Sequence, residues 1–200
     1  GALNATPTGT YNLAIGYFAG NDITSGSQNT SLGSFSGEKI TTGTRNTLVG
    51  YASGFRITEG GYNVIVGRSA GDAITTGSSN TIVGDNAASA MVTGEQNTFI
   101  GAGANQTGVT TGSKNTGIGR SALRVITSGA SNTVVGADAG YILTTGNYNF
   151  FGGALSGAAV TTGTYNVALG YNSMGVSAGL TGSNNIAIGK DAGEDITSAS

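Results

Sequence analysis

The sequence has no cysteine, no histidine, one proline and only 9% charged residues in a chain of 200. Without cysteine there can be no disulfide framework and no thiolate chemistry. Without histidine the chain also lacks the commonest general base, and most zinc sites need one or both residue types. We therefore expect no catalytic residues, no cofactor-binding residues and no metal site, and we expect that the protein is not an enzyme.

Charge is sparse and nearly balanced, with 8 Lys and Arg against 10 Asp and Glu. Nucleic-acid binding requires a basic stripe or patch, which the sequence lacks, so we expect no nucleic-acid partner. Long hydrophobic runs are also missing. None approaches the roughly 20 residues that cross a bilayer, and we expect no membrane insertion.

Glycine, in contrast, is abundant at 37 residues, and much of it belongs to a repeat. The phrase Gly-x-x-Asn-x-x-(Ile/Leu/Val)-Gly occurs eleven times, with Gly152 as the one departure at the apolar position. Its asparagines are spaced by 17 residues in eight of ten steps, by 18 once and by 19 once; they are Asn12, Asn29, Asn46, Asn63, Asn80, Asn97, Asn115, Asn132, Asn149, Asn166 and Asn185. A period this short and regular indicates one supersecondary unit stacked on itself.

Positions within a unit are counted here from its asparagine, which is position 0. Glycine occupies positions −3 and +4 in every unit, which predicts corners that need a positive φ or a close backbone approach. Position +3 is apolar, position +7 is always Ala or Ser, and position +11 is apolar in most units. We expect these last three columns to fill a narrow interior, and each unit to contain two short strands and two turns.

These patterns predict an all-β fold, a parallel β-solenoid or β-roll of about eleven 17-residue coils. Residues 1–200 are expected to form a single repeat domain and to be a segment of a longer fibre. Successive coils should rise by about 4.8 Å, which gives a rod of roughly 50 Å. The eleven asparagines should then stack into a structural ladder, with their amides bonded to neighbouring coils and to turn backbone.

The strand after each asparagine is apolar on both faces in many units, as in Leu48 with Val49 and Ile65 with Val66. Neighbouring residues of a strand point to opposite sides, so only one of each pair can face the coil interior. The other needs a second surface, and we expect burial against sister chains.

Aromatic and threonine columns are the candidate recognition features. Tyrosine recurs at position −1 in Tyr11, Tyr62, Tyr148 and Tyr165, and at position +5 in Tyr17, Tyr51 and Tyr171. These seven residues are possible receptor-facing residues that could stack on sugars, or they are ordinary strand residues that pack along the ladder. Threonine doublets near positions +12 and +13 favour turns over an ice-binding array, because adjacent residues point opposite ways.

Two units carry a resemblance to a known family, Thr161-Thr162-Gly163-Thr164-Tyr165-Asn166-Val167-Ala168-Leu169-Gly170 and Gly182-Ser183-Asn184-Asn185-Ile186-Ala187-Ile188-Gly189-Lys190-Asp191-Ala192-Gly193. They resemble the Thr-Gly-x-x-Asn-Thr-Ala-Ile-Gly-x-x-Ala-Gly repeats of viral and bacteriophage tail-fibre proteins. The resemblance extends through the other units and covers nearly the whole chain. A weaker likeness in the Asn-x-Ala-Ile-Gly core connects the sequence to the heads of trimeric autotransporter adhesins of the YadA family. Both resemblances imply a parallel homotrimer on a surface that attaches to a host.

The expected function is therefore a structural and adhesive fibre segment of a virus or phage tail fibre. Its expected partners are two further copies of itself and a host surface glycan or protein receptor. Its expected location is the virion surface, or the extracellular or cell surface. Three alternatives stay open: a cell-surface adhesin, a self-assembling extracellular filament, and a fibre-borne glycan depolymerase that would need paired carboxylates.

Overall fold

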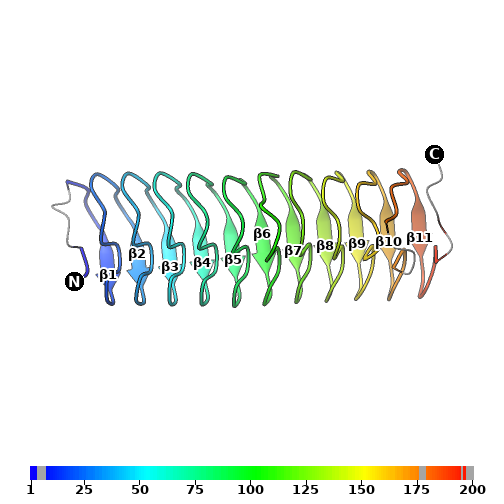
Figure 1. The fold of residues 1–200 in the computed structure, drawn as a ribbon, viewed down its shortest axis with the longest axis horizontal. Helices are drawn as coiled ribbons and strands as arrows, with labels where there is room; N and C mark the ends of the chain where they lie inside the picture. The colour runs from blue at the N-terminus through cyan, green and yellow to red at the C-terminus, as the bar shows by residue number, and fades with distance from the viewer. Residues whose placement is uncertain (4–7, 176–178, 195, 197–200) are drawn as a thin grey trace.

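The computed structural model describes residues 1–3, 8–175, 179–194 and 196, and it shows a parallel β-solenoid (Figure 1). Each unit contributes one strand of three residues. The strands are β1 (Leu13–Ile15), β2 (Thr30–Leu32), β3 (Thr47–Val49), β4 (Val64–Val66), β5 (Thr81–Val83), β6 (Thr98–Ile100), β7 (Thr116–Ile118), β8 (Thr133–Val135), β9 (Phe150–Gly152), β10 (Val167–Leu169) and β11 (Ile186–Ile188). This described part of the chain contains no helix long and apolar enough to cross a membrane.

The eleven strands form one sheet in sequence order, and every pair of neighbours is parallel. Equivalent positions of successive units face each other, so that Thr47 pairs with Val64 and Leu48 with Ile65. Figure 1 shows the strands side by side along a rod, with the two termini at opposite ends. The predicted all-β parallel solenoid is confirmed.

The prediction of two strands per unit is wrong, because the described residues form a single strand in each unit. The backbone around position +11 still bonds from coil to coil, as when the Thr41 amide donates to the Thr58 carbonyl at 2.9 Å. Within the described residues, however, only Val160 and Leu180 form an isolated bridge there. Left-handed residues at positions +6 and +8 explain the difference. In the second unit these are Phe35 (φ 60°) and Gly37 (φ 57°), and they curl the chain just before the single apolar residue at +11.

The prediction that position +3 fills the interior is also wrong. The buried strand residue is at position +2, where Leu48, Ile65 and Ile82 are fully buried, whereas positions +1 and +3 point outward. The asparagine at position 0 is buried, and side chains alternate along a strand, so position +2 shares its face and position +3 does not.

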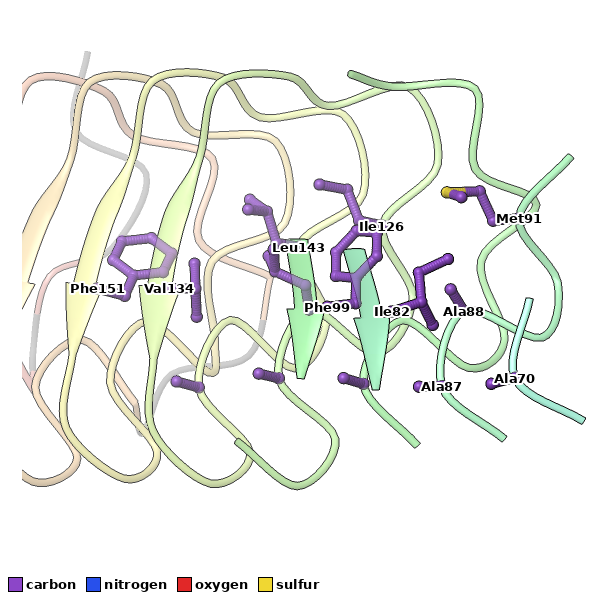
Figure 2. Packing of buried hydrophobic residues seen from close by; sticks show 14 of the residues in the cluster. Ala70, Ile82, Ala87, Ala88, Met91, Phe99, Ile126, Val134, Leu143 and Phe151 are labelled. Atoms are coloured by element: carbon purple, nitrogen blue, oxygen red, sulfur yellow. The ribbon is translucent and has the colours of Figure 1, made fainter. Parts of the chain in front are cut away.

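The +2 column varies widely in size, and neighbouring units compensate for each other. Phe99 in β6 packs beside Gly117 in β7, where an added Cβ would lie 3.0 Å from the Phe99 ring. Phe151 in β9 likewise faces Ala168 in β10. Figure 2 shows both phenylalanine rings reaching into the middle of the rod, toward residues such as Ile126 and Leu143 on the opposite wall. In these two pairs the ring of one coil occupies space that the small residue of the next coil leaves free.

The other two predicted interior columns are confirmed. Position +7 is buried from Ala19 to Ser173, and position +11 is buried from Ile23 to Val160 wherever it is apolar. The unit of 18 residues interrupts the second column: Val109 is exposed, and the fully buried Thr110 donates its hydroxyl to the Ile126 carbonyl at 2.8 Å. In the unit of 19 residues, positions 176–178 lie outside the described residues.

The two glycine corners have different physical causes. Every glycine at position +4 has a φ between 123° and 147°, a region that other residues rarely adopt. The glycines at position −3 lack a positive φ but lie against the next coil: at Gly60, for example, an added Cβ would lie 2.4 Å from the carbonyl oxygen of Gly77. Close backbone approach therefore requires glycine at both corners, and the positive φ is an additional requirement at position +4.

Candidate functional site

The eleven asparagines predicted to form a ladder do so along the whole rod. In each of the ten steps the side-chain oxygen accepts a hydrogen bond from the backbone amide of the next asparagine at 2.9–3.1 Å. The side-chain nitrogen donates to the carbonyl of the next position −3 glycine at 2.8–3.1 Å. From Asn29 to Asn166 these side chains are buried, so they hold coils together and present nothing to a ligand.

The tyrosines occupy two separate columns that flank the sheet. Tyr11, Tyr62, Tyr148 and Tyr165 precede their strands, and Tyr17, Tyr51 and Tyr171 follow theirs; all seven are more than half exposed. Only some of them touch other rings or cations. Tyr148 and Tyr165 stack at 5.0 Å with nearly parallel rings, and the Arg45 guanidinium lies 5.0 Å from the Tyr62 ring centre.

The residues at position −1 share an unusual backbone conformation. All eleven have a left-handed φ between 56° and 63°, and none is glycine. A left-handed conformation costs a residue with a Cβ roughly 1–2 kcal/mol, so the neighbouring coils must hold it in place. The four tyrosines at this position are therefore displayed on a constrained backbone.

The structure contains a wider aromatic cluster at one end of the rod, which was not predicted from the sequence. Phe18 and Phe35 at position +6 join Tyr17 and Tyr51 at position +5, and Phe55 packs against Phe35 from the next coil. The signal was present in the sequence, since each of the first three units carries an aromatic residue at position +5, at position +6 or at both. It becomes visible when the two columns are compared together.

A hollow of about 320 Å³ opens in this cluster, lined by Phe35, Tyr51, Ala52, Phe55, Ser69 and Asp72. It forms because the +6 column changes from phenylalanine, at Phe18 and Phe35, to the small residues Ala52 and Ser69. The missing ring volume leaves space between coils.

Asp72 contributes the one carboxylate among the residues that line the hollow. Its Oδ1 atom is buried and has no hydrogen-bond partner. Burial raises the pKa of Asp72 above its ordinary value, against the opposing effects of the Arg56 charge and of backbone amides. An incompletely compensated carboxylate beside aromatic rings is an unusual feature in a chain with so few charges.

The other charges mostly pair between coils on the surface. Arg68 lies 2.7 Å from Asp85, Arg120 pairs with Asp138, and Lys39 contacts both Asp22 at 3.1 Å and Glu38 at 2.8 Å. Hydrogen bonds to Glu38 and then to Asp22 raise the pKa of Lys39. Such exposed pairs contribute little stability, because solvent screens them.

The outward face of the sheet forms an apolar surface that extends along the rod. Position +3 places an aliphatic residue there in ten of the eleven strands, from Ile15 to Ile188 with Gly152 as the exception. Position +1 adds threonine in six strands and apolar residues in the other five. Side chains in the middle of this face stay partly exposed, 36% at Ile100 and 42% at Val135.

Groups that could carry metal or acid–base chemistry do not converge in the described part of the chain. No three His, Cys, Asp or Glu side chains of the described residues lie close enough to hold a metal ion. The geometry thus presents two surfaces of interest, the outward sheet face and the aromatic hollow at Asp72. No family model, no curated protein and no solved structure matches the chain.

Proposed function

We propose that the chain is a non-enzymatic segment of an attachment fibre, assembled as a parallel homotrimer through the outward faces of its sheets. The observation that supports this is the aliphatic column at position +3, which runs along the whole rod and stays partly exposed in a single chain. Contiguous apolar surfaces of this kind are typical of protein–protein contacts. The likeness of the repeats to tail-fibre repeats supports three chains, displayed on a virion or cell surface.

The regular ladder suits such a role, because a fibre must hold its shape over distance. Each of the ten steps repeats the bond to the asparagine oxygen and the bond to the glycine carbonyl, so each coil adds a similar interaction with its neighbours. Recognition of a host glycan or protein then falls to the variable corner residues, among them the exposed tyrosines. In this proposal the solenoid gives the fibre its length, and the corner residues determine which receptor it binds.

Sedimentation equilibrium tests the assembly. The mass is expected to be three times the 19.6 kDa of one chain. Val83→Lys, in the middle of the outward face, should reduce that mass toward a monomer, because three buried lysines would meet with unpaired charge. Thr76→Lys makes a similar change at an exposed turn residue and should leave the trimer intact. A stable folded monomer of the unaltered chain would contradict the proposal.

Attachment is tested separately, by screening the rod against glycans and surface proteins of candidate hosts, with a polysaccharide depolymerisation assay alongside. Saturable binding without loss of polymer length is the expected result. Shortened polysaccharide would instead favour the fibre-borne depolymerase.

The outward face also favours a second candidate, ice binding. Six strands place threonine at +1 and an aliphatic residue at +3 on the same face, and Figure 1 shows the strands in nearly the same orientation along the rod. Regularly spaced hydroxyl and methyl groups on one face are what an ice surface could contact. This role needs the face free, so a monomer that depresses the freezing point below the melting point would favour it over the fibre.

A further inference from the structure

The hollow at Phe35, Tyr51, Phe55 and Asp72 combines aromatic walls with a buried anionic atom. It lies in the corners beyond the ends of the strands, so an assembly through the outward sheet face leaves it accessible. Its volume of about 320 Å³ is at the lower end of the range for small-molecule sites.

The ring geometry favours a compact ligand over a flat one. The Phe35 and Tyr51 rings meet at 81° with centres 5.8 Å apart, and the Phe35 and Phe55 rings meet at 76° with centres 6.5 Å apart. Rings at such angles form walls that face different directions, whereas a sugar ring stacks on one flat platform. Aromatic walls around a compact volume are the arrangement that binds alkylammonium cations, through the negative faces of the rings.

Asp72 supplies the matching charge. Its Oδ1 atom has lost water without gaining a donor, and its raised pKa reports the cost of keeping the carboxylate ionised there. A cation in the hollow would lower that cost, whereas a neutral ligand would not. The polar groups of the lining are otherwise the hydroxyls of Ser69 and Tyr51, few for a polyhydroxylated ligand.

Two basic side chains from the coils that form the hollow are paired with other carboxylates. Arg68 is held by Asp85, and Lys39 is held by Asp22 and Glu38. The Arg56 charge acts on Asp72, yet no hydrogen bond reaches Oδ1. The charge of the carboxylate is therefore not fully compensated at the buried Oδ1 atom, and it can attract a cation that occupies the hollow.

We propose that this hollow binds a small alkylammonium group, such as the trimethylammonium head of choline, between Phe35, Tyr51 and Phe55 and beside the Asp72 carboxylate. The proposal does not rest on the fibre role, since the hollow is formed within one chain. It assigns a ligand class to a corner surface whose residues differ from coil to coil.

Titration with choline chloride, followed by NMR of the aromatic ring signals, tests the site directly. Choline is expected to shift the signals of Phe35, Tyr51 and Phe55 saturably. The neutral isostere 3,3-dimethylbutan-1-ol should bind about tenfold more weakly or worse, because it lacks the charge that the rings and Asp72 would attract. Equal binding of the two compounds, no saturable shift with choline, or shifts with a methyl glycoside alone would each overturn the proposal.

Variants separate the contributions of ring and carboxylate. Tyr51→Ala should weaken choline binding about tenfold, whereas Tyr51→Phe should retain it, since the ring face and not the hydroxyl makes the contact. Tyr171→Ala is the matched control, because Tyr171 occupies the same position +5 with similar exposure but lies outside the hollow. A loss of binding in the control equal to that in Tyr51→Ala would contradict the site.

Asp72→Asn provides a readout that a purely structural residue would not give. Choline binding should fall about tenfold at pH 7, while the melting temperature should stay the same or rise. Burial raises the pKa of Asp72 in the folded protein, so the ionised carboxylate destabilises the folded state when the pH exceeds that pKa. Asparagine carries no charge at pH 7, and the substitution therefore removes this destabilising effect. A variant that loses stability and keeps choline affinity would overturn the role of Asp72.

Discussion

Replacing Gly67 with alanine is expected to destabilise the rod by about 4 kcal/mol or more, or to prevent folding altogether. Two costs combine at this residue. Its φ of 141° lies in a region that is accessible almost only to glycine, and an added Cβ would lie 2.3 Å from the carbonyl oxygen of Gly84. That oxygen belongs to the backbone of the next coil, which cannot move without disturbing its own hydrogen bonds. Urea denaturation followed by circular dichroism, or the yield of soluble protein, measures the loss.

Gly152→Ala is the matched control for this prediction. Gly152 occupies the outward position +3, its φ is not positive, and the only neighbour of an added Cβ is the end of the Leu169 side chain at 2.9 Å. A side-chain end can move aside, and alanine reduces the entropy of the unfolded chain, so this variant should be neutral or more stable by up to about 1 kcal/mol. Equal losses at the two glycines would contradict the distinction between corner and strand.

Replacing Asn80 with alanine is expected to lower the free energy of unfolding by about 2–5 kcal/mol. The Asn80 side chain is buried and donates to the Gly94 carbonyl at 2.9 Å and to Asn63 Oδ1 at 3.1 Å. Its own oxygen accepts from the Asn97 amide at 2.9 Å. Alanine would leave the Gly94 carbonyl and the Asn97 amide buried and unpaired, although Asn63 Oδ1 would keep its bond from the backbone amide of residue 80. An unpaired buried group costs more than the net value of the bond itself.

The control for the ladder is Asn147→Ala, which removes the same amide from a partly exposed residue. Asn147 accepts from the Ala130 amide and donates to the Thr145 carbonyl, and water can replace it at both groups. The expected loss is about 1 kcal/mol or less. Similar losses for Asn80 and Asn147 would show that burial of the ladder is not what makes it important.

The coil architecture could be predicted from the sequence because its physical causes act locally and repeat. Glycine at two fixed positions and asparagine at a third specify corners and a ladder in every unit, so eleven copies of the pattern support one interpretation. The small side chains at +7 and the apolar ones at +11 were placed correctly for the same reason. Each column has one environment, and its composition reports that environment.

The orientation of the strand was predicted wrongly because the residue types at positions +2 and +3 do not reflect which of the two is buried. Position +3 is nearly always aliphatic and looks like a core column, yet it faces outward, whereas the buried +2 column ranges from Gly117 to Phe99. A large residue at +2 lies beside a small one in the next coil at Phe99 and Phe151, so the +2 column does not show a uniform size. The position of the asparagine predicts the orientation of the strand better, since side chains two residues apart in a strand share a face. A buried asparagine at position 0 therefore places position +2 in the interior.

Only part of the candidate binding site could be predicted from the sequence. Tyr51 was among the tyrosines singled out, but Phe35, Phe55 and Asp72 were not. Their importance comes from the order of residues down two corner columns, where Phe35 is followed by Ala52 and Phe55 by Asp72. A hollow of this kind arises from contrast between adjacent coils, which a search for shared features of the repeat passes over.

The asparagine ladder also makes the two ends of the rod chemically different. From Asn12 to Asn166 each rung donates its amide to the glycine carbonyl of the following coil and accepts from that coil's backbone amide, whereas toward the preceding coil its backbone amide donates to the asparagine oxygen. A coil approaching with its chain direction reversed could not reproduce these bonds. Any continuation of the stack, whether by further repeats or by another molecule, must therefore join head to tail, and a fibre built on this ladder has a built-in polarity.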